Sequence, residues 1–250
     1  MSENKTGKYF KYAIGEIILV VIGILIALQI NNWNEARKER AMEVSYLKNL
    51  KADLINEVEN AEEFRAIHFG KAEASSFLLN SDLPTTIQDV ENYTNKYETV
   101  FIWFEFVPNN NTFKELLSSG NLSLIKNDSI KNGLLELDKL YAQVASGEHH
   151  MRREYEEYLY DINIKNTSAL GFFDITESKY GLLNRLSSKD IPESKYQKLI
   201  EDSQWQHNNQ TFQNGLKLAM MNNSLLAEKH RNLVDYIREL LKIIEEDINV

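Results

Sequence analysis

A run of apolar residues near the start of the sequence most constrains how this chain can fold. Residues 17–28 are twelve apolar residues in a row, with Glu16 before them and Gln29 after them. As a helix rising about 1.5 Å per residue, this run alone would span only about 18 Å. The 22 residues from Tyr12 to Trp33 would span about 33 Å, which matches a bilayer core of roughly 30 Å. We therefore predict a transmembrane helix over residues 12–33, preceded by a short basic tail over residues 1–11.

The flanks of this run favour a membrane helix over the alternatives. Tyr9, Tyr12 and Trp33 lie at its two ends, where amphipathic aromatic rings anchor a helix at the headgroup level. A buried helix of a soluble domain is less consistent, because the run is apolar on every side and little at a terminus could cover it. A cleavable signal peptide needs a small-x-small pair after the run, and none follows. We expect an uncleaved signal anchor.

The orientation of the anchor follows weakly from charge. Three lysines precede the helix and three basic residues follow it: Lys5, Lys8, Lys11, Arg37, Lys38 and Arg40. The free α-amine tips this balance towards an inside N-terminus, and long C-terminal domains translocate largely regardless of charge. We expect residues 36–250 to lie outside the cytoplasm.

Glu16 is the one acid at the edge of the apolar run. On a helical wheel it shares a stripe with Gly23 and Ala27, a small-xxx-small pair of the kind that lets two membrane helices approach closely. One interpretation is a homodimer or partner-helix seam along Glu16, Gly23 and Ala27, with Glu16 paired to a cation or an amide. The other is that Glu16 reaches the membrane interface. The sequence leaves both open.

Composition limits the rest of the chain. The formal net charge of −9 speaks against nucleic acid as a partner, because phosphate binding needs a basic face. The chain has no cysteine, which removes disulfides and thiolate metal sites. Three prolines and ten glycines in 250 residues favour long helices.

The residues after the anchor indicate a mostly α-helical protein. Residues 34–79 read as a stalk and first bundle helix, with an apolar stripe at Leu47, Leu50, Leu54, Val58 and Ala61. Residues 80–250 are expected to form the remainder of a single helical domain, an antiparallel bundle. Residues 99–107 could be a strand or a buried helix.

Local signals predict the element boundaries in this part. We expect a capping box at Thr112 and Glu115, a helix stop at Gly120, and a cap at Asp128 or Ser129. Asp174 and Glu177 form a second cap pattern, and Pro192 is expected near the first position of another helix. Residues 145–165 and residues 224–248 are predicted to be further helices.

Candidate chemistry is sparse. The best metal candidate is His149–His150 with the carboxylates Glu154, Glu156 and Glu157, but neighbouring histidines point about 100° apart on a helix, so we interpret this stretch as a solvated face. His230 lies in an apolar stripe and is expected to be a satisfied core histidine; His68 and His207 suggest nothing. No nucleotide-binding, hydrolase or zinc-protease motif occurs. We predict no catalytic, cofactor-binding or metal-binding residues.

Several stretches resemble a known family. "GEIILVVIGILIALQINNWNE" (15–35), "YLKNLKADL" (46–54) and "NNTFKELLSSGNLSLIKNDSIKNGLLELDKLY" (110–141) are similar to an uncharacterised family of single-pass membrane proteins, abundant in Bacteroidota and known as a domain of unknown function. The resemblance implies a membrane-anchored protein with a helical soluble domain. We expect the anchor to lie in the bacterial inner membrane and the domain in the periplasm. It implies no catalytic residues.

Two functions fit these observations. The first is a non-enzymatic interaction or scaffold protein of the cell envelope, with the lipid bilayer as one partner and a second copy or another membrane protein as a partner through the span. The alternative is a ligand-sensing or substrate-binding bundle with a pocket lined by a tyrosine-rich middle: Tyr141, Tyr155, Tyr158 and Tyr160. An enzyme ranks third.

Overall fold

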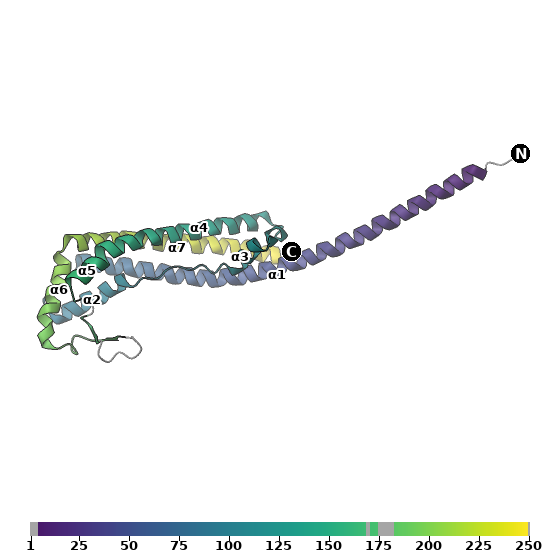
Figure 1. The fold of residues 1–250 in the computed structure, drawn as a ribbon. Coiled ribbons are helices and arrows are strands. Elements are labelled where there is room, and N and C mark those ends of the chain that lie inside the picture. Colours follow the sequence, from purple (N-terminus) through teal and green to yellow (C-terminus); the bar gives the residue numbers. More distant parts are fainter. Residues whose placement is uncertain (1–4, 169–170, 175–182, 250) are drawn as a thin grey trace.

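The fold is a long helical bundle with one helix that extends far beyond it. The computed structural model describes residues 5–168, 171–174 and 183–249. Helix α1 (Lys5–Asn80) runs for 76 residues without a break, since the first proline in the chain is Pro84. Its N-terminal part projects from the bundle as a single rod (Figure 1). The expected continuation of the apolar helix into a helical domain is confirmed, and the chain is mostly α.

Three long helices form the body of the bundle. Helix α4 (Asp128–Tyr155) continues through a π-helical turn, η2 (Glu156–Tyr160), into α5 (Asp161–Asn166), so the predicted helix 145–165 is part of a longer one. Helix α7 (Gln210–Ile248) begins well before residue 224 and is capped by Asn209. Helix α7 runs antiparallel to α1 and α4, but α1 and α4 run in the same direction (Figure 1). The expectation of a purely antiparallel bundle was therefore wrong.

An extended segment explains why α1 and α4 are parallel. Helix α2 (Ile87–Phe101) folds back along α1 and begins at a capping box formed by Thr86 and Asp89. Residues 102–110 are then extended and carry the chain back along α1. Residues 99–107 are thus neither a strand nor a whole buried helix. Pro108 lies in this segment, and proline disfavours helix in the residue before it.

The caps of the next helices differ in part from prediction. Helix α3 (Asn111–Ser118) has Asn110 as its N-cap without a side-chain bond, and the backbone N–H of Thr112 donates to Asp53 of α1 at 2.9 Å. A partner from another helix therefore replaces the predicted Thr112 box. The stop at Gly120 is confirmed by its φ of 73° before the 3₁₀ turn η1 (Asn121–Leu124). Asn127, not Asp128 or Ser129, caps α4.

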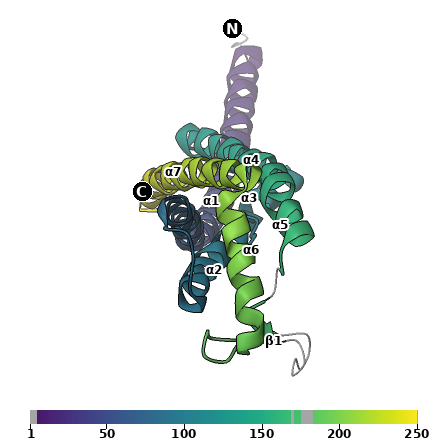
Figure 2. The ribbon, with the colours of Figure 1, turned by 90° about the vertical axis from the view of Figure 1, so that its left-hand side faces the viewer.

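Short elements close the end of the bundle away from the rod. Strands β1 (Phe173–Asp174) and β2 (Asn184–Arg185) pair antiparallel, followed by η3 (Glu193–Lys195) and α6 (Tyr196–Asn208). Helix α6 crosses this end of the bundle (Figure 2). Pro192 is the N-cap of η3, which runs directly into α6, so it lies one residue before the first position of this helical stretch. Glu177, half of the other predicted cap, lies outside the described residues.

Two separate apolar cores hold the long helices together. The first, nearer the rod, includes Leu47, Leu54, Leu134, Val144 and Ile237. The second, nearer the far end, surrounds residues such as Leu78, Leu159, Phe212 and Leu216. Between them each long helix contributes buried polar side chains, and this polar layer is the candidate site.

Candidate functional site

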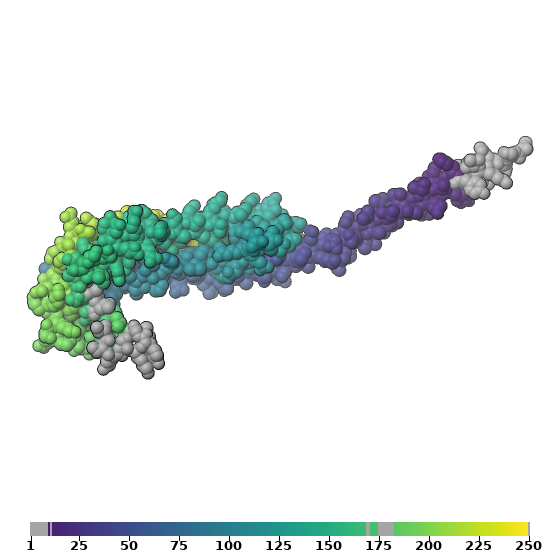
Figure 3. All heavy atoms as spheres, viewed as in Figure 1, coloured from purple at the N-terminus to yellow at the C-terminus, as the bar shows by residue number. Residues whose placement is uncertain are grey.

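The apolar part of α1 is exposed along its whole length. The stretch is long and apolar enough to cross a membrane, and none of it is buried; it stands apart from the bundle as a bare rod (Figure 3). A helix of the bundle core would be covered, so this stretch is not part of that core. Tyr12 is 78% exposed and Trp33 65%, and the guanidinium of Arg37 lies over the Trp33 ring.

The three residues of the predicted seam are also exposed. Glu16, Gly23 and Ala27 contact no other helix among the described residues, and a Cβ added at Gly23 would meet nothing within 4 Å. This geometry leaves room for a second helix. The seam stays a prediction, as does the anchoring role of Tyr12 and Trp33. The side chain of Tyr9 lies outside the described residues.

A network of charges marks the point where the rod enters the bundle. Glu43 is only 2% exposed; it accepts hydrogen bonds from Arg40 at 2.8 Å and from the backbone N–H of Lys126. Arg40 also pairs with Asp247 near the end of α7 at 3.0 Å. These bonds join α1, the segment before α4 and α7, and fix the base of the rod.

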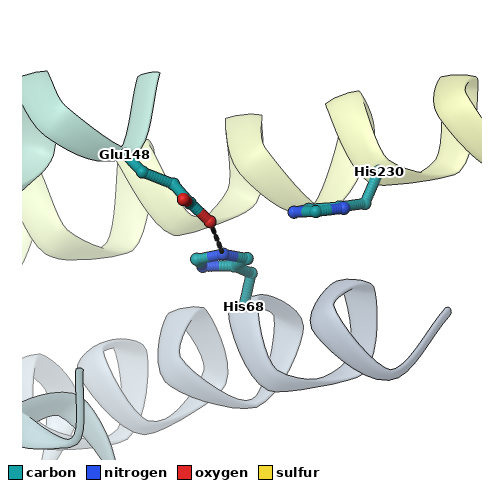
Figure 4. A group of neighbouring side chains, drawn as sticks. All are labelled: His68, Glu148 and His230. Atoms are coloured by element: carbon teal, nitrogen blue, oxygen red, sulfur yellow. Dashed lines mark ion pairs between the residues drawn. The ribbon is translucent and has the colours of Figure 1, made fainter. Parts of the chain in front are cut away.

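The polar layer between the two cores contains two histidines and a glutamate. His68 comes from α1, Glu148 from α4 and His230 from α7, and they are 3%, 4% and 0% exposed. One ligand atom from each lies within 4.8 Å of the others. Figure 4 shows the carboxylate of Glu148 and the ring of His230 directed towards His68.

The partners of His68 and Glu148 fix their orientation. Asn223 donates through its amide nitrogen to the carbonyl of Ala219, which leaves its Oδ1 facing His68 Nδ1 at 2.8 Å. His68 therefore carries its proton on Nδ1, and in a neutral ring Nε2 is a lone pair. The Oε2 atom of Glu148 accepts from the backbone N–H of Phe106 at 3.1 Å, so Oε1 is the oxygen that faces His68.

Two electron-rich atoms therefore face one another in the polar layer. His68 Nε2 and Glu148 Oε1 are 3.6 Å apart, and neither has a hydrogen-bond partner among the described residues. A carboxylate oxygen and an imidazole lone pair repel in a buried site of low dielectric. A positive charge between them, either a proton or a metal ion, resolves this conflict.

His230 completes the site and is not a satisfied core histidine. It is buried as predicted, but both of its ring nitrogens lack a hydrogen-bond partner among the described residues. Its ring stacks on His68 with centroids 5.5 Å apart and forms a T-shaped pair with Phe106, with centroids 4.8 Å apart. Burial, and then the neighbouring His68, lower the pKa of His230 to about 3, so its imidazole is neutral.

A buried lysine lies close to the polar layer. Lys71 follows His68 by one turn of α1, is 3% exposed, and stands over the ring of Trp103. Burial lowers the pKa of Lys71 to about 8, opposed by the charge of Glu148. A cavity of about 20 Å³ lined by Lys71, Met151 and Asn223 has room for about one water molecule.

The metal site considered from the sequence, His149–His150 with nearby glutamates, does not form a buried cluster in the structure. His149 and His150 are exposed; His150 lies 3.3 Å from Glu154, whose carboxylate also accepts from Asn222. Glu156 and Glu157 are exposed as well. The neighbouring residue Glu148, by contrast, faces the core.

The signal that could have revealed the buried cluster is the heptad register. The core face of α4 runs through Leu137, Tyr141, Val144, Glu148 and Met151, so Glu148 occupies an apolar position. His230 does the same between Leu226 and Leu233 of α7. A charged or imidazole side chain at a core position on each of three helices indicates polar partners inside the bundle.

The tyrosine-rich middle divides between two places. Tyr141 belongs to the first core. Tyr155 and Tyr160 instead line an open, mainly apolar groove of about 370 Å³ with Tyr97, Phe101 and Ile164. Tyr158 does not line it and is 37% exposed. The groove thus contains two of the four predicted tyrosines.

Comparison with known proteins identifies the family. The model of a family of unknown function, DUF6090, matches residues 16–205, which is 190 of the 250 residues. The chain belongs to this family. The match includes the apolar helix, His68 and Glu148, and it ends before His230. No curated protein and no solved structure matches the chain.

Proposed function

We propose that this DUF6090 protein is a membrane-anchored, non-enzymatic interaction or scaffold protein of the bacterial cell envelope. In this proposal residues 12–33 cross the inner membrane once as an uncleaved anchor, and the helical domain stands in the periplasm. The observation that carries the proposal is that the apolar part of α1 is exposed along its whole length and belongs to the same helix that enters the bundle. Burying so much apolar surface in lipid is strongly favourable.

The rigidity of the connection supports a positioning role. Helix α1 passes from the apolar stretch into the core without a loop, and the Arg40–Glu43–Asp247 network secures it to α7. An anchor linked in this way would hold the domain at a fixed distance and angle from the membrane. The resemblance of residues 15–35 to single-pass proteins of Bacteroidota favours the same topology.

Extraction from membranes tests the anchor. We expect the full chain to stay in the membrane pellet after alkaline carbonate washing, and its intact mass to include residues 1–33. The triple variant Ile18→Lys, Ile22→Lys, Leu25→Lys should move to the soluble fraction, because each lysine at a helix centre costs about 2.5–3.5 kcal/mol on insertion.

A matched variant controls for added charge. Leu117, Met221 and Leu225 are exposed apolar residues of the domain, and their replacement by lysine should leave the chain in the pellet. A wild-type chain that washes off, or an Ile18/Ile22/Leu25 variant that stays, would contradict the anchor. A mass that lacks the apolar run would replace the anchor with a cleaved signal.

Orientation can be read from single cysteines, because the chain has none of its own. We expect Ser224→Cys, on the exposed face of α7, to react with a membrane-impermeant maleimide in intact spheroplasts. Ser2→Cys should react only after lysis. The reverse pattern would place the domain in the cytoplasm.

A second function, binding of a small apolar ligand, is favoured by the groove between α2 and α5. Its volume of about 370 Å³ and its lining by Tyr97, Phe101 and Tyr155 suit a ligand of drug-like size. An apolar fluorescent probe tests this function. Binding that is abolished by Ile164→Lys but kept by Leu225→Lys would support a ligand site in the groove. No difference between these two variants would count against it.

A further inference from the structure

We propose that His68, Glu148 and His230 form a binding site for one divalent transition-metal ion, of which Zn²⁺ is the representative, that links α1, α4 and α7. This inference goes beyond the proposed anchoring role and does not depend on it. It rests on the geometry and hydrogen bonding of the polar layer between the two apolar cores.

The donor set suits such an ion. Two imidazole nitrogens and one carboxylate oxygen are ligands of zinc and of related first-row metals, whereas magnesium and calcium prefer oxygen ligands alone. Zinc with three protein ligands keeps a fourth position for water.

The distances are close to those of a metal site. Ligands about 2.0–2.1 Å from a tetrahedral ion lie roughly 3.3–3.5 Å from one another. His68 Nε2 and Glu148 Oε1 are already 3.6 Å apart. All three ligand atoms lie within 4.8 Å of one another, so a closure of at most about 1.5 Å brings the widest pair to metal-site spacing.

The surrounding bonds orient the ligands as second-shell bonds do in metal sites. A ligating histidine usually donates its other N–H to an oxygen, which fixes the tautomer and the ring. His68 does this through Nδ1 to Asn223, and the Phe106 N–H holds the second oxygen of Glu148. The atoms left without a partner among the described residues include His68 Nε2, Glu148 Oε1 and both nitrogens of His230.

A proton is the competing occupant, and His230 argues for the metal. A protonated His68 would satisfy Glu148 alone and would leave both nitrogens of His230 without a partner in the core. An unsatisfied buried polar group typically costs about 1–3 kcal/mol. A metal ion engages all three side chains at once and leaves only one nitrogen of His230 without a partner among the described residues.

Metal titration of the full chain in detergent tests the proposal. The protein is prepared without a histidine tag, stripped with a chelator and titrated with Zn²⁺ by calorimetry. We expect saturable binding of one ion per chain and a higher melting temperature when Zn²⁺ is added. Absence of one-to-one binding, with melting indifferent to Zn²⁺, would overturn the proposal in favour of a proton.

Variants locate the site. His68→Gln, Glu148→Gln and His230→Phe should each weaken Zn²⁺ binding by more than about 100-fold, because the loss of a second-shell partner alone costs 10–100-fold. The double variant His149→Gln, His150→Gln removes two exposed histidines next to Glu148 and should bind as wild type does. The opposite result would move binding to the surface and overturn the proposal.

One variant separates loss of the site from loss of the fold. His230→Phe removes two unpartnered nitrogens from the core, so the metal-free variant should melt no lower than the metal-free wild type. X-ray absorption of the zinc-loaded wild type gives a readout that needs no variant. We expect a shell of nitrogen and oxygen atoms with imidazole scattering; a shell without imidazole would refute the assignment.

Discussion

At the scale of the residue, Glu43 shows how hydrogen bonds offset the desolvation cost of a buried carboxylate. Its carboxylate is almost fully covered but accepts hydrogen bonds from the Arg40 guanidinium and the Lys126 backbone. A buried carboxylate with a charged partner and a backbone donor avoids most of the desolvation penalty that an isolated one would suffer.

Removing this carboxylate should be costly. We expect Glu43→Ala to lower the free energy of unfolding by roughly 2–3 kcal/mol. The substitution leaves the Lys126 backbone N–H and the Arg40 guanidinium without the carboxylate that accepts their hydrogen bonds. Chemical denaturation followed by circular dichroism measures this loss.

The exposed stalk offers a control for Glu43. Glu35 pairs with Lys38 one helical turn away, and both are more than half exposed. Glu35→Ala should change the free energy of unfolding by less than about 0.5 kcal/mol. Equal effects of the two variants would show that the buried network does not stabilise the bundle.

At the scale of the element, the π-helical turn η2 is matched to a glycine on the facing helix. Gly215 of α7 lies against the backbone of η2, and a Cβ added there would approach the carbonyl of Tyr158 at 2.8 Å. The extra residue that a π turn accommodates in one turn thus lies where α7 approaches the backbone of η2 closely. A side chain at position 215 would push the two helices apart.

The same substitution at two glycines should have opposite effects. We expect Gly215→Ala to lower the free energy of unfolding by about 1–3 kcal/mol through overpacking. Gly70→Ala, where a Cβ would meet nothing within 4 Å, should raise it by about 0.5–1 kcal/mol because alanine is the better helix former. Thermal or urea unfolding of both variants in the same detergent compares them; destabilisation by both would contradict the role of the η2 contact.

At the scale of the whole molecule, the rod separates two different environments. Residues 12–33 expose apolar side chains on every face, whereas the bundle buries apolar residues in the two cores between its long helices and in a smaller cluster around Phe172 and Leu199. If the rod lies in a bilayer, the stripe of Glu16, Gly23 and Ala27 is the face on which a second helix can approach most closely.

Self-association through this stripe gives a whole-molecule prediction. Replacing Gly23 and Ala27 by leucine should weaken dimer formation in a membrane two-hybrid assay, because larger side chains hold the backbones apart. Ile18→Leu with Leu25→Ile, on the opposite face of the helix, should have no effect. If the Gly23/Ala27 variant is expressed normally and associates as strongly as the wild type, the predicted helix-packing seam is contradicted.

Helical character was predictable because it depends on local pattern. The apolar stripe from Leu47 to Ala61 and the scarcity of proline suffice for a long α1, and Gly120 marks the end of α3 through its left-handed φ. Caps were less predictable where tertiary contacts compete. The Thr112 box is displaced by Asp53, which is distant in sequence and reaches the same N–H.

The sequence by itself determined that this chain is mostly helical and carries an apolar helix long enough for a membrane, because periodicity and run length are properties of neighbouring residues. Only the tertiary structure decided that α1 and α4 run parallel and that His68, Glu148 and His230 meet. They lie on three helices, far apart in sequence, so no local spacing relates them. Their meeting depends on the register in which the helices pack, and that register is set by the two apolar cores on either side.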